Sequence, residues 1–361
     1  MTTEALNSSF DAAKKAKEDE FYTQLTDIER ELKHYKKYLK GKIVYCNCDD
    51  PRVSNFFHYF SYNFEKLGLK RLITTCYRSQ NADLFSRNDS EKAVYLEYDG
   101  DKNQNMVPDP DEIGIKPLKG DGDFRSAESI DLLQRTNIVV TNPPFSLFRE
   151  FVAQLMKYDK RFVIIGNLNA ITYNDIFKLI KDDKLWLGYG FQAGNAYFAV
   201  PPAHAGAYAK GVYDEATGLV KFRNVAWFTN LDTSKRHEDI ILYKSYNRDE
   251  YPTYDNYDAI EVAKVADIPC DYDGVMGVPL TFLDKHNPDQ FEIVGLSGTD
   301  DYPMSKKYGK KERVVDGKRV KSNTGTLRAV IRTESFGPGT HFDVGYPVKG
   351  VYRRLFIRRR G

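Results

Sequence analysis

Short apolar runs alternate with amphipathic stretches along the first 190 residues of the chain. The apolar runs fall at residues 42–46, 72–75, 93–97, 138–140 and 162–165. After the first run, Val53, Phe56, Phe60 and Phe64 recur at helical spacing, and similar stripes follow the last two runs. Strands that alternate with single helices form βαβ units, because two parallel strands need a crossover between them. The alternation therefore predicts an α/β fold around a mainly parallel sheet.

Two further patterns flank this alternation. Residues 21–39 repeat apolar side chains at helical spacing among many charges, which predicts a helix before the first strand. Runs at 222–228 and 240–243 predict closing strands, with no helix between them.

The pattern changes beyond about residue 245, where Tyr, Asp, Pro and Gly become frequent and helical stripes disappear. The dipeptide Asp316-Gly317 between apolar residues predicts a hairpin. We therefore divide the chain into an α/β domain over residues 1–245 and a mixed or β-rich region over residues 246–361.

Charge is distributed unevenly along the chain. Residues 305–361 carry 16 Lys and Arg against 4 Asp and Glu, a balance of +12, which leaves −10 for the first 304 residues of a chain whose net charge is +2. A basic segment on an acidic body favours a polyanionic partner. A solvated basic surface without a partner is the alternative.

The four cysteines are too few for a disulfide framework in a chain of 361 residues. The N-terminus lacks the apolar core of a secretory signal, and no apolar run approaches the roughly 20 residues of a membrane span. These features predict a reduced, cytoplasmic protein. Cys46 and Cys48 are separated by one residue, and no second Cys or His pair has zinc spacing, so we expect no metal site.

The predicted strand at 138–140 runs into the stretch TNPPFS, residues 141–146. Ligands of parallel α/β sheets bind at the carboxyl ends of the strands, where residues 47–54 and 76–77 form two further polar corners. Pro143 and Pro144 remove two backbone donors and stiffen the turn. A stiff turn holds the Asn142 side-chain oxygen and nearby carbonyl groups as acceptors, beside the flat ring of Phe145.

This set of groups suits a planar ring that carries an amine. Two acceptors take hydrogen bonds from an exocyclic NH₂ group while the ring stacks on the aromatic face. The lone pair of such an amine is delocalised, and acceptors that favour a pyramidal, partly positive nitrogen stabilise the transition state more than the ground state. The corner therefore predicts a clamp for an amine.

Longer stretches of the sequence resemble one family. They are DEFYTQLTDIERELKHYKKYLKGKIVYCNCDDPRVSNFF, AWFTNLD and GVMGVPLTFLDKHNPDQFEIVGL. TNPPF resembles the Asn/Asp-Pro-Pro-aromatic motif of amino-methyltransferases. Over nearly its whole length the chain resembles the EcoRI-type adenine-specific DNA methyltransferases. The resemblance implies a Rossmann-like domain that uses S-adenosylmethionine, an adenine flipped out of DNA, and methyl transfer to its N6. The order of cofactor corner, catalytic corner and recognition region resembles the gamma class.

The resemblance gives Asn142 and Pro143 the role of amine acceptors, in the turn that Pro144 stiffens, and gives Phe145 the role of stacking ring. The expected cofactor-binding residues are Phe21, Tyr22 and Thr23; Asn47, Cys48, Asp49, Asp50, Ser54 and Asn55; Cys76 and Tyr77; and Asp121, Asp123 and Phe124. Two features depart from the usual pattern. The first corner lacks a glycine-rich loop, and Cys76 and Tyr77 stand where an acidic residue commonly holds the ribose.

An adenine inside a duplex must leave the stack to reach such a corner. A second ring opposite Phe145 is expected, and Trp227, Phe228, Tyr197 and Phe198 are equally eligible, although all four fit a core as well. The expected DNA contacts are Lys306, Lys307, Lys310, Lys311, Arg313, Lys318, Arg319 and Lys321. The tail RRLFIRRR is expected to be a closing strand or, alternatively, a second phosphate patch.

The sequence thus favours a sequence-specific DNA adenine N6-methyltransferase of a restriction–modification system, acting as a monomer, with a cognate restriction endonuclease or alone. RNA adenine and cytosine N4 in DNA are alternative substrates for the same chemistry. A protein-glutamine methyltransferase shares the corner but has less reason for a basic C-terminal segment. A silent DNA- or cofactor-binding module is the alternative from another class, although pure binding does not need an amine clamp.

Overall fold

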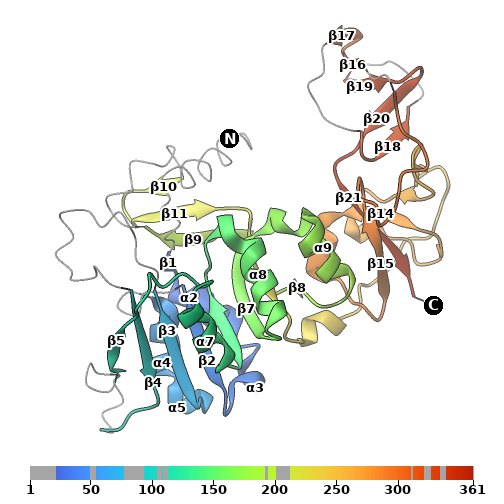
Figure 1. Ribbon diagram of the computed structural model, residues 1–361. Helices are drawn as coiled ribbons and strands as arrows, with labels where there is room; N and C mark the ends of the chain where they lie inside the picture. The colour runs from blue at the N-terminus through green and yellow to red at the C-terminus, as the bar shows by residue number, and fades with distance from the viewer. Residues whose placement is uncertain are drawn as a thin grey trace. The chain divides into compact units, whose positions relative to one another are not determined.

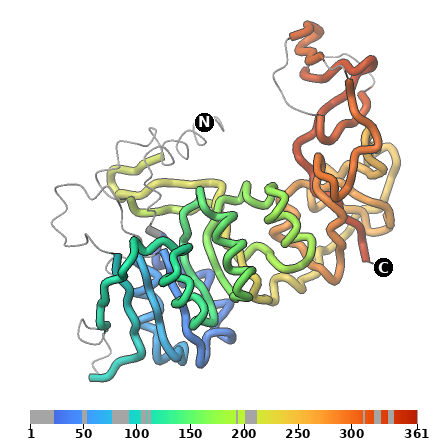
Figure 2. Tube along the Cα trace, in the orientation of Figure 1, coloured from blue at the N-terminus to red at the C-terminus, as the bar shows by residue number. Residues whose placement is uncertain are grey.

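The structure is a computed structural model that describes residues 22–48, 54–76, 93–103, 108, 113–191, 194–200, 212–309, 312–320, 327–333 and 339–360. The chain divides into two compact units. The first unit comprises Met1–Ile176 and Leu185–Thr233, and the second comprises Phe177–Lys184 and Ser234–Gly361. Figure 1 labels the elements of both units, and Figure 2 follows the chain through them.

An eight-stranded mixed sheet forms the centre of the first unit (Figure 1). Its order is β5-β4-β3-β2-β6-β7-β12-β8. The strands are β2 (Ile43–Asn47), β3 (Arg71–Thr75), β4 (Val94–Tyr98), β5 (Ile115–Pro117), β6 (Ile138–Thr141), β7 (Arg161–Asn167), β8 (Trp186–Leu187) and β12 (Val225–Thr229). The neighbours β3, β2, β6 and β7 are parallel, and the remaining pairs are antiparallel. The expected α/β class is confirmed, with a large mixed sheet.

The expectation of a mainly parallel sheet holds only for its centre. β3, β6 and β7 each follow a helix that carries the chain back to the opposite edge. β12 instead follows β11 (Leu219–Phe222) after only two residues. With no helix to return the chain, β12 enters the sheet in the opposite direction.

The helices of the first unit are short, and two of them begin at a serine cap. The helices are α2 (Leu25–Leu32), α3 (Lys36–Leu39), α4 (Asn55–Tyr62), α5 (Phe64–Leu67), α7 (Ala127–Gln134), α8 (Phe148–Lys157) and, shared with the second unit, α9 (Asn174–Lys181). The Ser54 side chain accepts hydrogen bonds from the Phe56 and Phe57 amides at the start of α4. Gly68, with φ of 62°, ends α5 in the left-handed conformation that glycine adopts without strain.

The helix expected over residues 21–39 is divided into β1 (Tyr22–Thr23), α2 and α3. The chain leaves helical geometry after Leu32 and resumes it at Lys36. This break turns Tyr35 and Leu39, which are 0% and 1% exposed, into the same core cluster as Ile28. Burial of these side chains outweighs the continuity of one helix.

A second, antiparallel sheet of the first unit contains β1, β9 (Ala196–Ala199), β11 and β10 (Tyr213–Asp214), in that order. Thr23 of β1 pairs with Phe198 of β9. The segment before the central sheet is therefore tied to a strand more than 170 residues later.

The second unit contains two sheets. One has the order β13 (Ile260–Glu261), β14 (Met276–Pro279), β21 (Arg354–Arg359) and β15 (Phe291–Leu296). The other has the order β17 (Lys318–Val320), β16 (Glu312–Val315), β19 (Thr340–Asp343), β20 (Pro347–Gly350) and β18 (Val330–Arg332). Figure 2 shows the red β21 among the orange strands of the first of these sheets.

The expected hairpin at Asp316-Gly317 is confirmed, since β16 and β17 pair across these two residues, both of which have positive φ. The expected tail strand is β21, which lies inside its sheet rather than at an edge. The strand expected at 240–243 is wrong. The Gln290 side chain satisfies both the N–H and the C=O of Ile240, at 2.8 and 2.9 Å, in place of a neighbouring strand.

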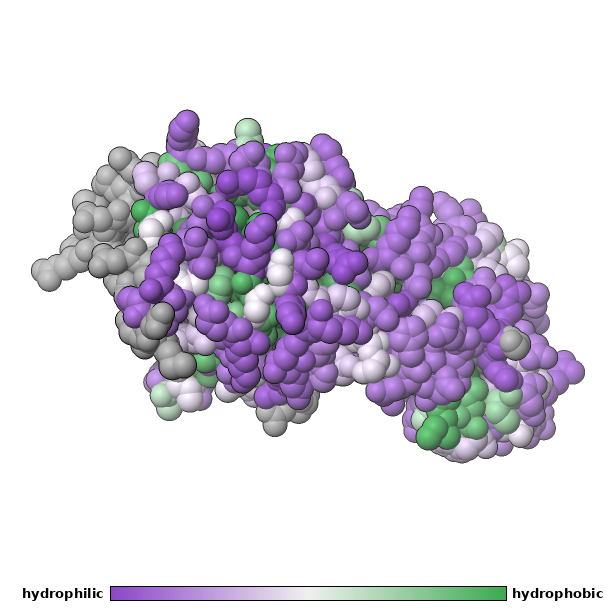
Figure 3. Space-filling view, turned by 90° about the horizontal axis from the view of Figure 1, so that it is seen from below, coloured by the Kyte–Doolittle hydropathy of each residue, from purple (hydrophilic) through white to green (hydrophobic). Residues whose placement is uncertain are grey.

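Hydrophilic side chains cover most of the face seen in Figure 3. No helix among the described residues is long and apolar enough to cross a membrane.

Candidate active site

Asn47, Cys76 and Asn142, where the three polar corners begin, lie at one edge of the central sheet, because β3, β2 and β6 are adjacent and parallel. Asn47 at the end of β2 pairs with Thr75 of β3, directly before Cys76. Tyr45 pairs with Val139, and two residues further this register puts Thr141 level with Asn47. Asn142 therefore follows at the same edge. The sheet itself brings the corners together.

The corner after β6 is held from both sides. β6 is buried along its whole length, and Pro143 is buried beside it. Beyond the short helix η1 (Phe145–Leu147), Phe148 of α8 packs against Phe228 with ring centroids 4.9 Å apart. A Cβ atom at Gly166 of β7 would collide with the Phe148 ring, so glycine permits this close approach. Backbone and packing thus fix the Asn-Pro-Pro-Phe turn.

The acceptors of this turn differ in their availability. The Pro144 carbonyl accepts the Leu147 N–H at 3.0 Å. Within the described part of the chain, no donor reaches the Pro143 carbonyl. Pro143 is therefore the proline whose carbonyl oxygen remains for a ligand, beside the half-buried Asn142.

Phe145 is half-buried and packs on the edge of the large core cluster. Three of the four rings considered for its opposite face are wholly buried, namely Trp227, Phe228 and Phe198. Tyr197 is 39% exposed, and the Lys221 ammonium lies 5.7 Å from its ring centroid. Of the four, Tyr197 alone has a ring that solvent reaches.

The expected cofactor residues at the first corner meet the N-terminal segment. Asn55 Nδ2 at the start of α4 donates to the Thr23 carbonyl at 2.7 Å, so β1 lies against the beginning of α4. Asn47 and Thr23 are buried, and no described group hydrogen-bonds the Asn47 Oδ1 or the Thr23 Oγ1. Ser54 caps α4, and Cys48 is half-buried. Phe21, Asp49 and Asp50 lie outside the described residues, as does the side chain of Tyr22.

These groups fit the amino-acid end of S-adenosylmethionine. A buried acceptor without a donor costs about 1–3 kcal/mol, which a ligand bearing N–H groups offsets. Asn47 Oδ1 and Thr23 Oγ1 are such atoms, and both belong to the corner where α4 begins. An ammonium group is therefore well matched to this corner.

The second corner is closed by the loop over residues 120–124. Gly122 has φ of 79°, and a Cβ atom there would collide with the Cys76 carbonyl oxygen. The loop therefore lies against Cys76, as a shared cofactor site requires. Tyr77 is outside the described residues.

Two side chains of this loop, Asp123 and Phe124, already have partners within the protein. Arg125 donates to both carboxylate oxygens of Asp123 at 2.9 and 2.7 Å, and these hydrogen bonds hold the pKa of Asp123 below its usual range. Phe124 is 5% exposed and packs edge-to-face on Phe151 of α8. Asp121 is exposed. The Asp121 carboxylate is therefore accessible to a ligand, whereas the Phe124 ring is buried in the core.

A buried carboxylate that sequence reasoning missed organises another part of the first unit. Glu31 of α2 is 0% exposed and accepts hydrogen bonds from the Tyr35 hydroxyl at 2.8 Å and from the Tyr189 and Gly190 amides at 2.9 and 3.0 Å. Burial raises the pKa of Tyr35, and so does the neighbouring Glu31. Two of the three partners of Glu31, the amides of Tyr189 and Gly190, are 158 and 159 residues away, so no local sequence pattern predicts these contacts.

The expected DNA-contacting residues lie in the second unit, where Lys310, Lys311 and Lys321 are outside the described residues. Arg319 pairs with Glu312 and Asp343, each at 2.8 Å. Lys306 bonds Asp255 and Tyr346. Lys307, Arg313 and Lys318 have no acidic partner among the residues described. Among the described members of the set, these three cations are the most available to a polyanion.

The described parts of the chain contain neither a metal site nor a disulfide bond. No group of three or more His, Cys, Asp and Glu side chains there is arranged to hold a metal ion. Cys46 is buried in β2, and Cys48 lies beyond its end.

Comparison with known proteins agrees with the geometry. The family model described as adenine-specific methyltransferase EcoRI matches residues 9–336. The Type II methyltransferase M.EcoRI of Escherichia coli is 50% identical over 311 residues, which cover 84% of this chain and 94% of that protein. Type II methyltransferase M.MgeORF184P of Mycoplasma genitalium is 38% identical, over 89% of this chain and 94% of its own. Type II methyltransferase M.MpnI of Mycoplasma pneumoniae is 37% identical, over 89% and 93%.

No solved structure matches the chain. The family match spans most of the sequence and includes all three corners at the carboxyl edge. On this evidence, the chain belongs to the EcoRI family of adenine-specific methyltransferases.

Proposed function

We propose that this methyltransferase transfers the methyl group of S-adenosylmethionine to N6 of an adenine that has left a DNA duplex. The observation that carries the proposal is the meeting, at one sheet edge, of the Asn142–Phe145 turn with the corner of Asn47. A Rossmann-like reading of the first unit agrees with parallel central strands whose carboxyl ends hold both corners. The family supports adenine as the base.

The turn after β6 acts on the amine. Asn142 Oδ1 and the Pro143 carbonyl accept its two N–H groups, which favours the pyramidal nitrogen of the transition state over the planar nitrogen of the ground state. Neither group needs to be a strong base, since the positive charge that develops on nitrogen makes its proton acidic. The fixed backbone keeps both acceptors in place without reorganisation during the reaction.

Phe145 holds the target ring. Its exposed part offers a stacking face worth about 1–3 kcal/mol per base, which offsets part of the cost of unstacking. Tyr197 is the ring we propose for the opposite face, because it is the accessible candidate.

The cofactor occupies the first two corners. Asn47, Thr23, Ser54 and Asn55 meet its amino-acid end, and the loop against Cys76 borders the remainder. Bound there, S-adenosylmethionine supplies a methyl group activated by its sulfonium centre.

The second unit supplies the DNA contacts in this proposal. Lys307, Arg313 and Lys318 approach backbone phosphates, and residues 246–361 contain the recognition surface. The relatives are named Type II methyltransferases, which favours a partner of a restriction endonuclease acting at the same site. We propose that this methyltransferase acts as a monomer, as the family resemblance implies.

One assay tests the proposal. Purified protein, unmethylated duplex DNA and methyl-labelled S-adenosylmethionine are incubated, and the nucleosides of the digested DNA are separated. Label in N6-methyladenine is expected with the parent and absent with Asn142→Ala. Label in N4-methylcytosine would show that the target base is cytosine rather than adenine. No label in DNA, with the cofactor still bound, would show that DNA is not the substrate.

A further inference from the structure

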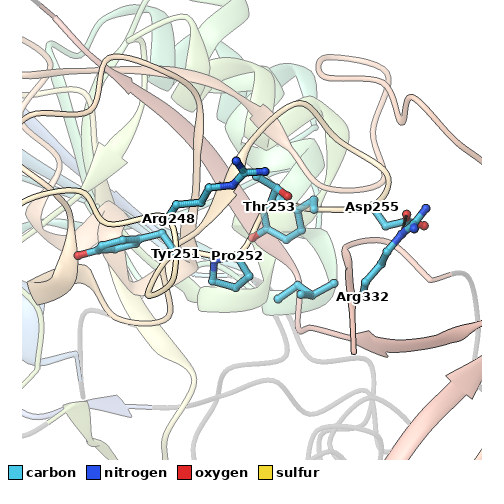
Figure 4. Close-up of a pocket in the computed structure, with 8 residues that line it drawn as sticks. Arg248, Tyr251, Pro252, Thr253, Asp255 and Arg332 are labelled. Carbon is cyan, nitrogen blue, oxygen red and sulfur yellow. Dashed lines mark hydrogen bonds and ion pairs between the residues drawn. The ribbon is translucent and has the colours of Figure 1, made fainter. Parts of the chain in front are cut away.

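A pocket of about 420 Å³ lies within the second unit, between the segment at residues 248–255 and strand β18 (Figure 4). Arg248, Thr253, Asp255 and Arg332 contribute its polar lining. Figure 4 shows Arg248 at one end of the pocket, with Asp255 and Arg332 together at the other. None of these residues belongs to the corners of the first unit.

Arg332 is held in place at one side of its guanidinium group. Its Nε atom donates to Asp255 Oδ1 at 2.7 Å, and its guanidinium carbon lies 4.6 Å from the centroid of the Tyr346 ring. The Arg332 side chain remains 68% exposed, and Asp255 is its only acidic partner among the described residues. A carboxylate and an aromatic ring thus fix a guanidinium whose outer edge is open to a ligand.

Asp255 is the positioning residue. Its side chain is 4% exposed, and its other oxygen accepts from Tyr308 and Tyr346 at 2.7 Å each and from Lys306 at 3.3 Å. Burial alone raises the pKa of this carboxyl, but the hydrogen bonds from Tyr346, Arg332, Tyr308 and Lys306 outweigh it and hold the pKa well below its usual range. Asp255 therefore stays charged and has no capacity left for a ligand.

The charge around the pocket is positive. Lys306 and Arg332 both bond the single carboxylate of Asp255, and Arg248, at the other end of the pocket, has no acidic partner among the described residues. The exposed Asp249 and Glu250 beside Arg248 are screened by solvent and are not part of the lining. The lining therefore selects an anion.

The shape of the site narrows the anion to one chemical class. A guanidinium group suits the oxygens of a tetrahedral phosphate, which accepts bidentate hydrogen bonds. A base edge is recessed in its groove and needs a protruding side chain, whereas backbone phosphates protrude and fit a concave site. We infer that this pocket binds backbone phosphates of the substrate DNA, one at Arg332 and another at Arg248 at its other end. The inference rests on the proposed action on DNA.

Equilibrium binding of a duplex that the parent methylates tests the inference, with the affinity measured at several salt concentrations. Each bound phosphate contributes about 0.9 to the slope of log K against log salt. We expect Arg332→Gln and Arg248→Gln to weaken binding and lower this slope, with the preference for the methylated site over other sequences unchanged. Because the two side chains bind different phosphates, the double variant should lower the slope by about 1.8 in total, about 0.9 for each arginine.

Three further variants separate positioning from charge. Arg332→Lys keeps the charge but loses the planar fork, so it should lose affinity while keeping most of the slope. Asp255→Asn removes the partner of Arg332 and should weaken binding even though it adds positive charge. Arg135→Gln is the matched control, because Arg135 is 48% exposed, pairs with Glu97 at 3.2 Å and precedes β6, at the end of that strand away from Asn142. It should change neither affinity nor slope.

Unchanged affinity and slope in Arg248→Gln and Arg332→Gln, with native melting temperatures, would overturn the phosphate site. A loss confined to the methylated site, with the slope intact, would also overturn it and indicate base reading. These results leave the proposed function standing as long as the parent still labels adenine in DNA. Failure of that labelling would instead sink the proposed function itself.

Discussion

The two units build their polar sites in different ways. In the first unit the corners of Asn47, Cys76 and Asn142 lie together because neighbouring parallel strands end at one edge, so backbone hydrogen bonds set their spacing. In the second unit the pocket depends on Asp255, one carboxylate that gathers side chains 51 to 91 residues away. A site fixed by backbone register tolerates changes of charge, whereas a site fixed by one ionised group depends on pH and on each partner.

The largest effect is expected at Asn142, in the first unit, where the register of the strands sets the position of the site. Asn142→Ala removes one acceptor for the amine and should lower kcat by about 10²–10³, as loss of one transition-state hydrogen bond does elsewhere. Cofactor binding measured by calorimetry should stay near the parental value, because the Asn47 corner is unchanged. Equal losses of cofactor affinity and turnover would show that the two corners are not independent.

The variant Glu31→Ala tests whether the stability of the first unit also depends on a single carboxylate. Three donors, from Tyr35, Tyr189 and Gly190, would lose their acceptor, and each unsatisfied buried donor costs about 1–3 kcal/mol. We expect the free energy of unfolding in urea to fall by at least about 2 kcal/mol. Glu31→Gln keeps an acceptor oxygen and should lose less. Equal stability of both variants and the parent would contradict the role given to Glu31.

Phe145→Ala should reduce kcat/KM by about 5- to 160-fold, which corresponds to the loss of about 1–3 kcal/mol of stacking. A mismatch opposite the target adenine lowers the cost of unstacking and should restore part of the rate. If the mismatch gave no more benefit to Phe145→Ala than to the parent, Phe145 would act elsewhere than on the flipped base.

The smallest effect is expected on the stability of the Asp255 site at low pH. The pKa of Asp255 is lower in the folded protein than in the unfolded chain, where it is about 3.9. The unfolded chain then binds more protons, so the stabilisation from Asp255 is present above about pH 4 and is lost as pH falls toward the folded pKa. Urea unfolding between pH 3 and 6 should show a steeper acid loss for the parent than for Asp255→Asn. Parallel curves would mean that Asp255 does not hold the second unit.

The same contrast explains how far the sequence predicted this protein. The corners at Asn47, Cys76 and Asn142 follow strands that local hydrophobic pattern reveals, so their meeting at one edge could be anticipated. The antiparallel β12 and the break between α2 and α3 could not, because they depend on core packing by residues such as Tyr35. Asp255, Arg248 and Arg332 carried no local signal, since only tertiary contacts bring them together.

The position of β21 inside its sheet determines when the second unit can fold during translation. This strand lies between β14 and β15, which are made some 60 to 80 residues earlier, and each of them pairs with β21 rather than with the other. Their sheet therefore stays open until the ribosome has delivered Arg359. The first unit has all its described strands by Thr229 and can fold on the translating ribosome, whereas this sheet of the second unit must wait for the end of translation of β21.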